Sequence, residues 1–171
     1  MNEIWIVSDT HFGHANILKF KHTDGSLIRG QRFSSVEEMD EHMIERWNSV
    51  VRHGDKVYHL GDVFMGDGHS ALKRLNGHKR LILGNHDNVK SPYLYNSFQK
   101  ILMWRQFPEF NCVLSHAPLH ESSLGFKVQY NVHGHTHDYS INDPRYFNVC
   151  VEKMDYTPIH MEDLIARLPP L

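Results

Sequence analysis

Residues 81–87 read LILGNHD, in which three apolar residues and a glycine are followed by an amide, an imidazole and a carboxylate. An unbroken apolar run of this kind is typical of a strand that is buried on both faces of a sheet. Gly84 permits a sharp turn in which no side chain blocks a ligand. We therefore expect a buried strand that presents Asn85, His86 and Asp87 at its carboxyl end.

Four other stretches share this design, in which an apolar strand ends in aspartate, histidine or glycine. They are residues 4–11, 57–62, 112–116 and 132–137. Their polar residues include Asp9, His11, Asp62, His116, His135 and His137. Histidine is the commonest metal ligand and the usual acid or base near neutral pH, and the chain has 15 of them. The repetition, rather than any single stretch, predicts one shared site at the strand ends.

Helix signals lie between these strands. Ser35 and Glu38 form a capping box, after which apolar residues at helical spacing predict a helix to about residue 51. Gly77 is expected to be a left-handed cap that ends a second helix. That helix is expected at residues 69–76. Other helices are expected at residues 15–20, from residue 91 and at residues 158–168, and further strands are expected at 101–105, 110–114 and 146–151.

The composition indicates one domain, residues 1–171, because 171 residues with 40% hydrophobic content can bury one sizeable core. The net charge of −2 gives no general basic field for long nucleic acid, so an anionic substrate has to be held locally. Cys112 and Cys150 each lie in an apolar segment and are expected to be reduced thiols, which favours a cytoplasmic protein. No leader, membrane-spanning run or obligatory protein partner is evident.

In chain order, the strand ends spell D-x-H at 9–11, G-D at 61–62, G-N-H-D at 84–87, a single histidine at 116 and G-H-x-H at 134–137. This ordered set resembles the calcineurin-like metallophosphoesterase superfamily, and the resemblance covers residues 9–137. It implies a small, uncapped α/β protein with two packed mixed β-sheets flanked by helices, as a four-layer sandwich. It also implies ligands on loops at the strand ends.

The resemblance further implies two metal ions, with Asp62 as the bridge between them. One ion would be held by Asp9, His11, Asp62 and His137, and the other by Asp62, Asn85, His116 and His135. His86 is not a ligand in this pattern. We assign it as the general acid that protonates the departing alkoxide, with Asp87 as its orienting partner.

Elementary charge arithmetic agrees with an anion-binding site. Two divalent ions carry about +4 and two carboxylates remove 2, which leaves about +2 to attract a phosphate. The same charge lowers the pKa of a shared water, so that a bridging hydroxide could attack phosphorus in line. Mixed imidazole, carboxylate and amide ligation suits two divalent or trivalent ions, with manganese as the first expectation and iron, zinc or nickel as alternatives.

Substrate contacts are expected close to these clusters. Residues 21–34 are polar and lack periodicity, so they form a loop that is either a solvated connector or a substrate-facing segment. In the second case, Arg29 or Arg32 would steady a phosphate. His14 could touch a substrate oxygen.

Several other functions can be weighed against the same residues. Residues 61–68 read GDVFMGDG and lack the arginine of the serine/threonine phosphatase pattern G-D-x-x-D-R-G, which argues against a protein phosphatase. The order of residues 133–139 does not fit the metallo-β-lactamase motif, and zincin, nucleotide-loop and dinucleotide motifs are missing. The expected activity is phosphodiester hydrolysis on a small molecule, a nucleotide or a nucleic-acid end. The alternatives are a phosphomonoesterase with the same site and a non-catalytic scaffold of the same fold.

Overall fold

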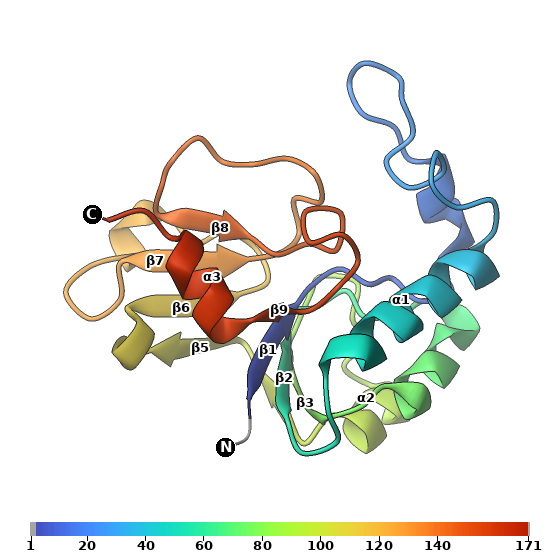
Figure 1. Ribbon diagram of the computed structural model, residues 1–171, viewed down its shortest axis with the longest axis horizontal. Helices are drawn as coiled ribbons and strands as arrows, with labels where there is room; N and C mark the ends of the chain where they lie inside the picture. The colour runs from blue at the N-terminus through green and yellow to red at the C-terminus, as the bar shows by residue number, and fades with distance from the viewer. Residues whose placement is uncertain (1–2, 171) are drawn as a thin grey trace.

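Two β-sheets and three α-helices organise the chain in the computed structural model, which describes residues 3–170 (Figure 1). The first sheet contains β1 (Ile4–Val7), β2 (Lys56–His59), β3 (His78–Ile82), β4 (Lys100–Leu102) and β9 (Ile159–His160). The second contains β5 (Trp104–Phe107), β6 (Cys112–Ser115), β7 (Tyr130–His133) and β8 (Tyr146–Asn148). The α-helices are α1 (Val36–Val50), α2 (Pro92–Ser97) and α3 (Met161–Arg167). The 3-10 helices are η1 (Ala15–Lys19), η2 (Gly66–Arg74), η3 (Pro108–Phe110) and η4 (Glu121–Ser123).

Both sheets are mixed, so the predicted α/β fold with two mixed sheets is confirmed. The first has the order β4-β3-β2-β1-β9, in which only β9 is antiparallel to its neighbour. The second has the order β5-β6-β7-β8, in which only β5 is antiparallel. Because parallel strands end at the same edge of a sheet, the loops after β1, β2 and β3 meet, and so do the loops after β6 and β7.

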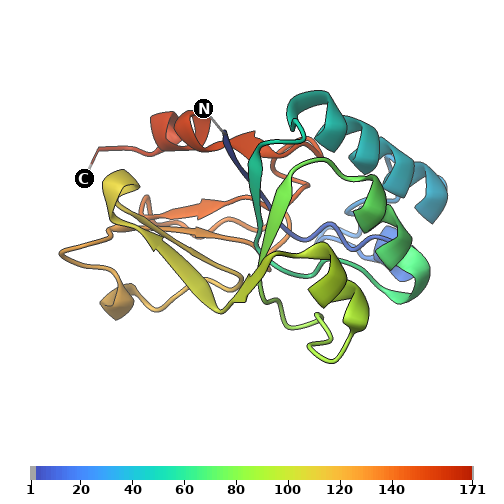
Figure 2. The ribbon, with the colours of Figure 1, turned by 90° about the horizontal axis from the view of Figure 1, so that it is seen from below.

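Each face of the first sheet buries its own core. On one face, Val57 and Leu81 pack with Met39, Met43 and Trp47 of α1, whose buried residues recur at helical spacing. The opposite face packs against the second sheet, and residues of α3 complete this core. Its members include Ile6, Tyr58, Leu60, Ile82, Phe107, Leu114, Val132, Met161 and Leu164. Figure 2 shows α1 and α2 on one side of the first sheet and the second sheet on the other. The outer face of the second sheet borders a small pocket at Val113, which is also lined by Trp104 and Gln106 of β5 and by Leu119 and Ser123.

Several predicted elements differ in detail from those observed. The single strand expected at 101–105 is two strands, β4 and β5, which belong to different sheets and are separated only by Met103. The helix expected at 69–76 is the 3-10 helix η2, and Gly77 has φ +90° but lies after its end at Arg74. Ser35 caps α1 as predicted, whereas the carboxylate of Glu38 accepts from Ser34 N–H rather than from Ser35.

Two expectations about composition can also be compared with the structure. Cys112 and Cys150 are buried free thiols, as predicted. Within residues 3–170, no helix combines the length and the apolar character that crossing a membrane requires.

Candidate metal centre

The structure brings all seven residues predicted as metal ligands together at the carboxyl ends of the parallel strands. Asp9, His11 and His137 form one group, with one ligand atom from each within 4.8 Å of the others. Asp62, His116 and His135 form a second group by the same measure. Asn85 joins the second group, because its Oδ1 lies 2.8 Å from His116 Nε2. The described chain therefore contains two candidate metal-binding groups, one from each predicted set.

Asp62 lies between the two groups. Its Oδ2 is 3.6 Å from His11 Nε2 in the first group and 3.5 Å from His116 Nε2 in the second. Its Oδ1 accepts a hydrogen bond from the backbone N–H of His86 at 2.9 Å. One oxygen of Asp62 is thus fixed by the backbone, and the other faces an imidazole from each group.

Among residues 3–170, five buried side-chain atoms have no hydrogen-bond partner, and two of them face one another in the first group. These two are Asp9 Oδ1 and His11 Nε2, which lie 3.8 Å apart. The other carboxylate oxygen of Asp9 accepts from Ser8 Oγ at 2.5 Å and from the N–H of His135 at 2.8 Å. Burying polar atoms without partners is costly, and a cation between these two would satisfy both. The donor set therefore fits a metal ion.

The acidity of Asp9 agrees with this interpretation. Burial raises the pKa of its carboxyl, but the neighbouring imidazoles of His11, His116 and His137 outweigh burial and hold the pKa well below its usual range. Asp9 is therefore ionised at any physiological pH and is available as an anionic ligand.

Backbone and carboxylate acceptors orient two of the imidazoles. His116 Nδ1 lies 2.7 Å from the carbonyl of Leu60, so this nitrogen carries the proton and Nε2 is left to face Asp62. His137 Nδ1 lies 2.9 Å from Glu152 Oε1, which leaves its Nε2 free in the same way. In each case the ring is held with one nitrogen available to a metal.

Glu152 was not predicted from the sequence. It is buried and accepts from His137 and also from the guanidinium of Arg29, at 2.7 Å from both Nε and Nη2. Burial raises the pKa of Glu152, but Arg29 and His137 outweigh burial and lower the pKa to about 2. A signal was present, because Glu152 follows the apolar residues 149–151 just as the ligands follow their strands.

The two arginines expected to steady a phosphate are engaged elsewhere. Arg29 is 0% exposed, and besides Glu152 it donates to the backbone carbonyls of Asp9 and Thr10. This expectation is corrected for Arg29, because a fully buried guanidinium holds the first metal-binding loop from inside and cannot reach a substrate. Arg32 is exposed and donates to Asp155 at 2.5 Å, so its charge is compensated at the surface.

His86 and Asp87 also lie at the site, but they do not form a pair. The His86 ring is exposed and its centroid is 5.7 Å from that of His11. The carboxylate of Asp87 accepts from the backbone N–H groups of Asp62, Val63 and Gly84. Asp87 therefore fixes the loops that carry the ligands, which corrects the expectation that it orients His86. His14, half-buried, has its Nδ1 3.4 Å from His11 Nδ1 at the edge of the site.

Left-handed backbone conformations are concentrated at the ligands. Asp9, His11, Asp62, His135 and His137 have φ between +49° and +68°. This region is unfavourable for residues other than glycine, by roughly 1 to 3 kcal/mol each, and it clusters at functional sites. The turns direct successive polar side chains into one site, and this explains why the D-x-H and G-H-x-H spacings can place both residues of each pair at the metal centre.

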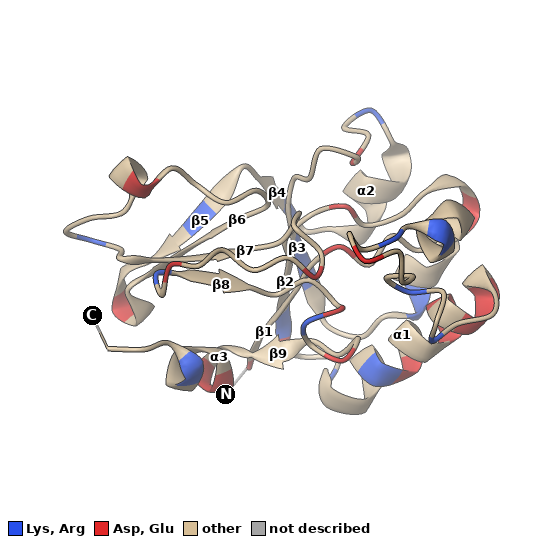
Figure 3. Ribbon diagram, turned by 90° about the horizontal axis from the view of Figure 1, so that it is seen from above, with Lys and Arg blue, Asp and Glu red and all other residues tan. Residues whose placement is uncertain are grey.

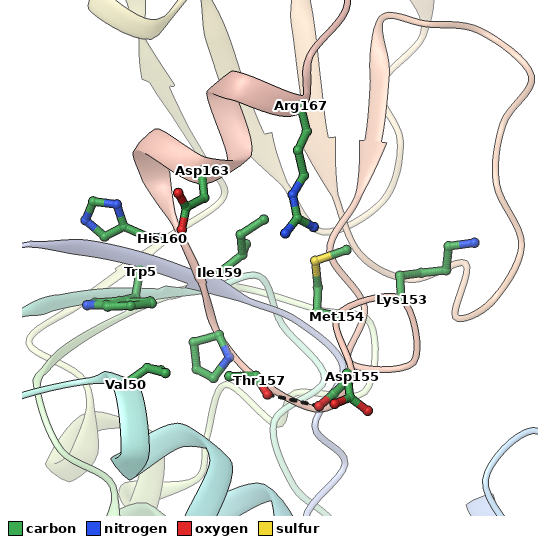
Figure 4. A pocket seen from close by; sticks show the side chains of 11 residues that line it. Trp5, Val50, Lys153, Met154, Asp155, Thr157, Ile159, His160, Asp163 and Arg167 are labelled. Atoms are coloured by element: carbon green, nitrogen blue, oxygen red, sulfur yellow. Dashed lines mark hydrogen bonds between the residues drawn. The ribbon is translucent and has the colours of Figure 1, made fainter.

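The candidate centre differs from the groove shown in Figure 4. That groove opens beside Trp5 and Met154 and is also lined by His160 and Arg167. None of the predicted ligands lines it. A separate groove of about 270 Å³ adjoins His86 and is lined by Phe64, Met65 and Tyr93. The second groove, unlike the first, is lined by His86, which lies at the candidate centre.

Comparisons with known proteins give relatives of undefined activity. No protein-family model matches the chain. The chain is 34% identical to the uncharacterized protein MJ1445 of Methanocaldococcus jannaschii, over 98% of this chain and 92% of that one. It is similar to the crystal structure of AQ665, a protein of unknown function from Aquifex aeolicus, with a TM-score of 0.74, 25% identity and coverage of 96% and 98%. A structure described as a novel archaeal phosphodiesterase has a TM-score of 0.47 and 19% identity, over 85% and 82% of the two chains, a likeness too distant to support an activity.

Proposed function

Because the chain belongs to the family of the uncharacterized protein MJ1445 of Methanocaldococcus jannaschii, whose name states no activity, we propose its function from the site: metal-dependent hydrolysis of phosphoesters at a dinuclear centre. One observation carries the proposal, namely that Asp62 Oδ2 faces His11 in one ligand group and His116 in the other. A carboxylate in this position is suited to bridging two ions. The unpartnered Asp9 Oδ1 and His11 Nε2 support the same assignment.

In this proposal each metal would be held by one of the two ligand groups, with Asp62 shared. Two ions, when bound, would attract the phosphoester anion and activate water for in-line attack. The protein would present the carboxylates of Asp9 and Asp62 to the ions and would hold His116 and His137 with one nitrogen each toward the centre. No protein nucleophile is required. Manganese remains the first choice of metal, with iron, zinc and nickel as alternatives.

His86 is the residue we propose as general acid. Its backbone N–H is anchored to Asp62 Oδ1, while its ring is exposed beside His11. A solvent-exposed imidazole at the rim can donate a proton to the leaving oxygen and recover one from water. General acid catalysis of this kind contributes about 10² to 10⁴ in rate. His14 is proposed as a weaker contact to a substrate oxygen at the same rim.

Two observations favour a diester over a monoester. The groove of about 270 Å³ beside His86, lined by Phe64, Met65 and Tyr93, offers room for the leaving group of a diester. A monoester carries a second negative charge, and the arginines that could have met it, Arg29 and Arg32, are committed to Glu152 and Asp155. Phosphodiester hydrolysis is therefore the favoured activity, and the monoester is the alternative.

The test of the activity is hydrolysis of bis-p-nitrophenyl phosphate beside p-nitrophenyl phosphate, with chelator-treated protein before and after addition of manganese. We expect manganese-dependent cleavage that favours the diester. Preference for the monoester would select the alternative. No cleavage of either ester by protein that binds two ions would overturn the proposal in favour of a non-catalytic scaffold.

The role of His86 is tested with His86→Ala on esters of different leaving groups. We expect a large loss with a poor alkyl leaving group and a small loss with p-nitrophenol, which departs without protonation. His53→Ala is a matched control, because His53 is also exposed but lies in the turn before β2, at the opposite end of that strand from Asp62. Equal losses on both esters would remove His86 from the role of acid.

A further inference from the structure

A second charged feature lies at the amino-terminal ends of β2, β3 and β4. On the face that meets the second sheet, Leu60, Ile82 and Leu102 belong to or pack against the core between the sheets. Two residues earlier on the same face stand Tyr58, Arg80 and Lys100, which are paired in register across the three strands. Lys56 precedes Tyr58 on this face. The inner face of the sheet therefore changes from apolar to cationic along its strands.

These cations line a groove of about 680 Å³ between the two sheets. Arg105 of β5 adds a fourth charge from the second sheet, and Lys and Arg segments on β3 and β5 are blue in Figure 3. No acidic residue lines the groove. Within residues 3–170, none of these four side chains is paired with an aspartate or glutamate, in contrast to Arg29, Arg32, Arg46, Arg74 and Arg145. The positive charge of the groove is therefore uncompensated by the protein.

The arrangement costs stability in the free protein. Arg80 and Lys100 are direct cross-strand partners, and like charges in that position repel one another. Aromatic rings support two of the guanidinium groups, with Arg80 5.6 Å from the ring centre of Tyr58 and Arg105 5.0 Å from that of Phe107. Such rings hold the side chains in place without neutralising them. A bound anion would relieve the repulsion.

An aromatic residue stands beside these charges. Trp104 stands at the edge of the groove, where it also borders Val113 on the outer face of the second sheet, and it is 59% exposed, which is high for a tryptophan in a strand. Grooves that combine cations with exposed aromatic rings are typical of single-stranded nucleic-acid sites, where the cations meet phosphates and the rings stack on bases. A duplex would need a longer basic surface than this short groove offers on a chain of net charge −2.

We propose that this groove binds single-stranded nucleic acid, with Lys56, Arg80, Lys100 and Arg105 on phosphates and Trp104 against a base. The site is separate from the candidate metal centre, because Lys56 and Arg80 lie toward the amino ends of β2 and β3, whereas Asp62 and Asn85 follow their carboxyl ends. The proposal therefore does not depend on the phosphoesterase activity. A general basic field is absent from the chain, but the charge is concentrated locally.

The test is fluorescence anisotropy of a short fluorescein-labelled oligothymidylate with the full chain, in the presence of a chelator. A chelator prevents metal-dependent binding at the other site and keeps the two proposals distinguishable. We expect binding that weakens with salt, with a logarithmic slope no steeper than about −3, since four phosphate contacts on a single strand give about −0.7 each. Binding that disappears with the chelator would belong to the metal centre and would overturn the proposal.

The decisive variant is the double substitution Arg80→Gln with Lys100→Gln. It removes the repelling pair, so the free protein should be at least as thermostable as wild type, while the affinity falls about tenfold or more. The matched control is Lys73→Gln with Lys127→Gln, which removes the same charge from two exposed sites outside the groove. Equal affinity of the two double variants would overturn the proposal.

A third variant separates nucleic acid from other polyanions. Trp104→Ala should weaken oligothymidylate binding about 5- to 150-fold, the range for loss of one stacked base. It should leave weak competition by inorganic phosphate unchanged. If Trp104→Ala has no effect and polyglutamate competes as well as unlabelled oligothymidylate, the groove is a site for acidic polypeptides and the nucleic-acid proposal fails.

Discussion

The substitution Glu152→Gln isolates the charge that links the buried arginine to the candidate metal centre. The carboxylate accepts from His137 Nδ1 at 2.9 Å and from Arg29 Nε at 2.7 Å through the same oxygen, Oε1. Glutamine can keep an oxygen at that position and has the same shape. What it removes is the counter-charge of Arg29, which is 0% exposed.

The structure sets the size of the effect on stability. The pKa of Glu152 falls from its usual 4.5 to about 2 in the folded protein. At about 1.4 kcal/mol for each pKa unit, this depression contributes about 3 kcal/mol to folding. Because the folded pKa is the lower one, the contribution is fully present above about pH 4.5 and is lost as the pH falls toward 2. Removing one partner of a buried ion pair gives a similar cost of about 3 to 5 kcal/mol.

The effect on metal binding follows from the negative charge beside His137, which raises the basicity of that imidazole as a ligand. Loss of a carboxylate that orients a metal-bound histidine weakens metal affinity by about 10- to 100-fold. We therefore expect Glu152→Gln to lower the unfolding free energy at pH 7 by about 3 kcal/mol, measured by urea unfolding of metal-free protein. Manganese affinity, measured by competition with a chelating indicator, should fall at least about tenfold.

Two comparisons decide whether this reasoning holds. Glu121→Gln is the control, because Glu121 also pairs with an arginine, Arg145, but is 65% exposed, and exposed pairs contribute only about 0 to 1 kcal/mol. The difference between wild type and Glu152→Gln should narrow below about pH 4.5, as the carboxylate of the unfolded wild-type chain becomes protonated. A difference that stays constant with pH, or one no larger than that of Glu121→Gln, would refute the role of the buried charge.

Other predictions concern the bridge, a close backbone approach and a helix cap. Asp62→Asn should reduce bound metal from two ions per chain to at most one, measured by atomic absorption, and retention of two would exclude Asp62 as the bridge. Gly84→Ala should destabilise the fold by about 1 to 3 kcal/mol, because its Cβ would lie 2.3 Å from Asp62 Oδ1; Gly125→Ala, with nothing within 4 Å, should be nearly neutral. Ser35→Ala removes the Oγ that accepts from Glu38 N–H, so calorimetry should show a loss of about 1 kcal/mol and a melting temperature about 2 to 4 °C lower; no change would mean that the cap is dispensable.

The sequence by itself determined which strands are followed directly by residues able to bind a metal or transfer a proton. An apolar run followed by glycine and polar residues can be recognised without knowledge of distant contacts, because it is a local pattern. This pattern occurs at residues 81–87 and in the matching blocks around Asp9, Asp62, His116 and His135. For the same reason the long helix α1, with its regular stripe of buried residues after Ser35, was predictable. The class of fold and the composition of the candidate site followed from these patterns together with the family resemblance.

Only the tertiary structure decided what the remaining charged groups do. The roles of Arg29, Glu152 and Asp87 depend on partners from distant segments, such as the pairing of Arg29 with Glu152 across 123 positions, so the sequence analysis assigned Arg29 and Asp87 wrongly and missed Glu152. The change of sheet at Met103 and the cations that face the groove between the sheets are likewise decided by the way strands pair and pack. Local propensity predicts which residues end a strand, whereas the neighbours of a buried charge are set by long-range packing, and a single sequence does not encode that packing in any short pattern.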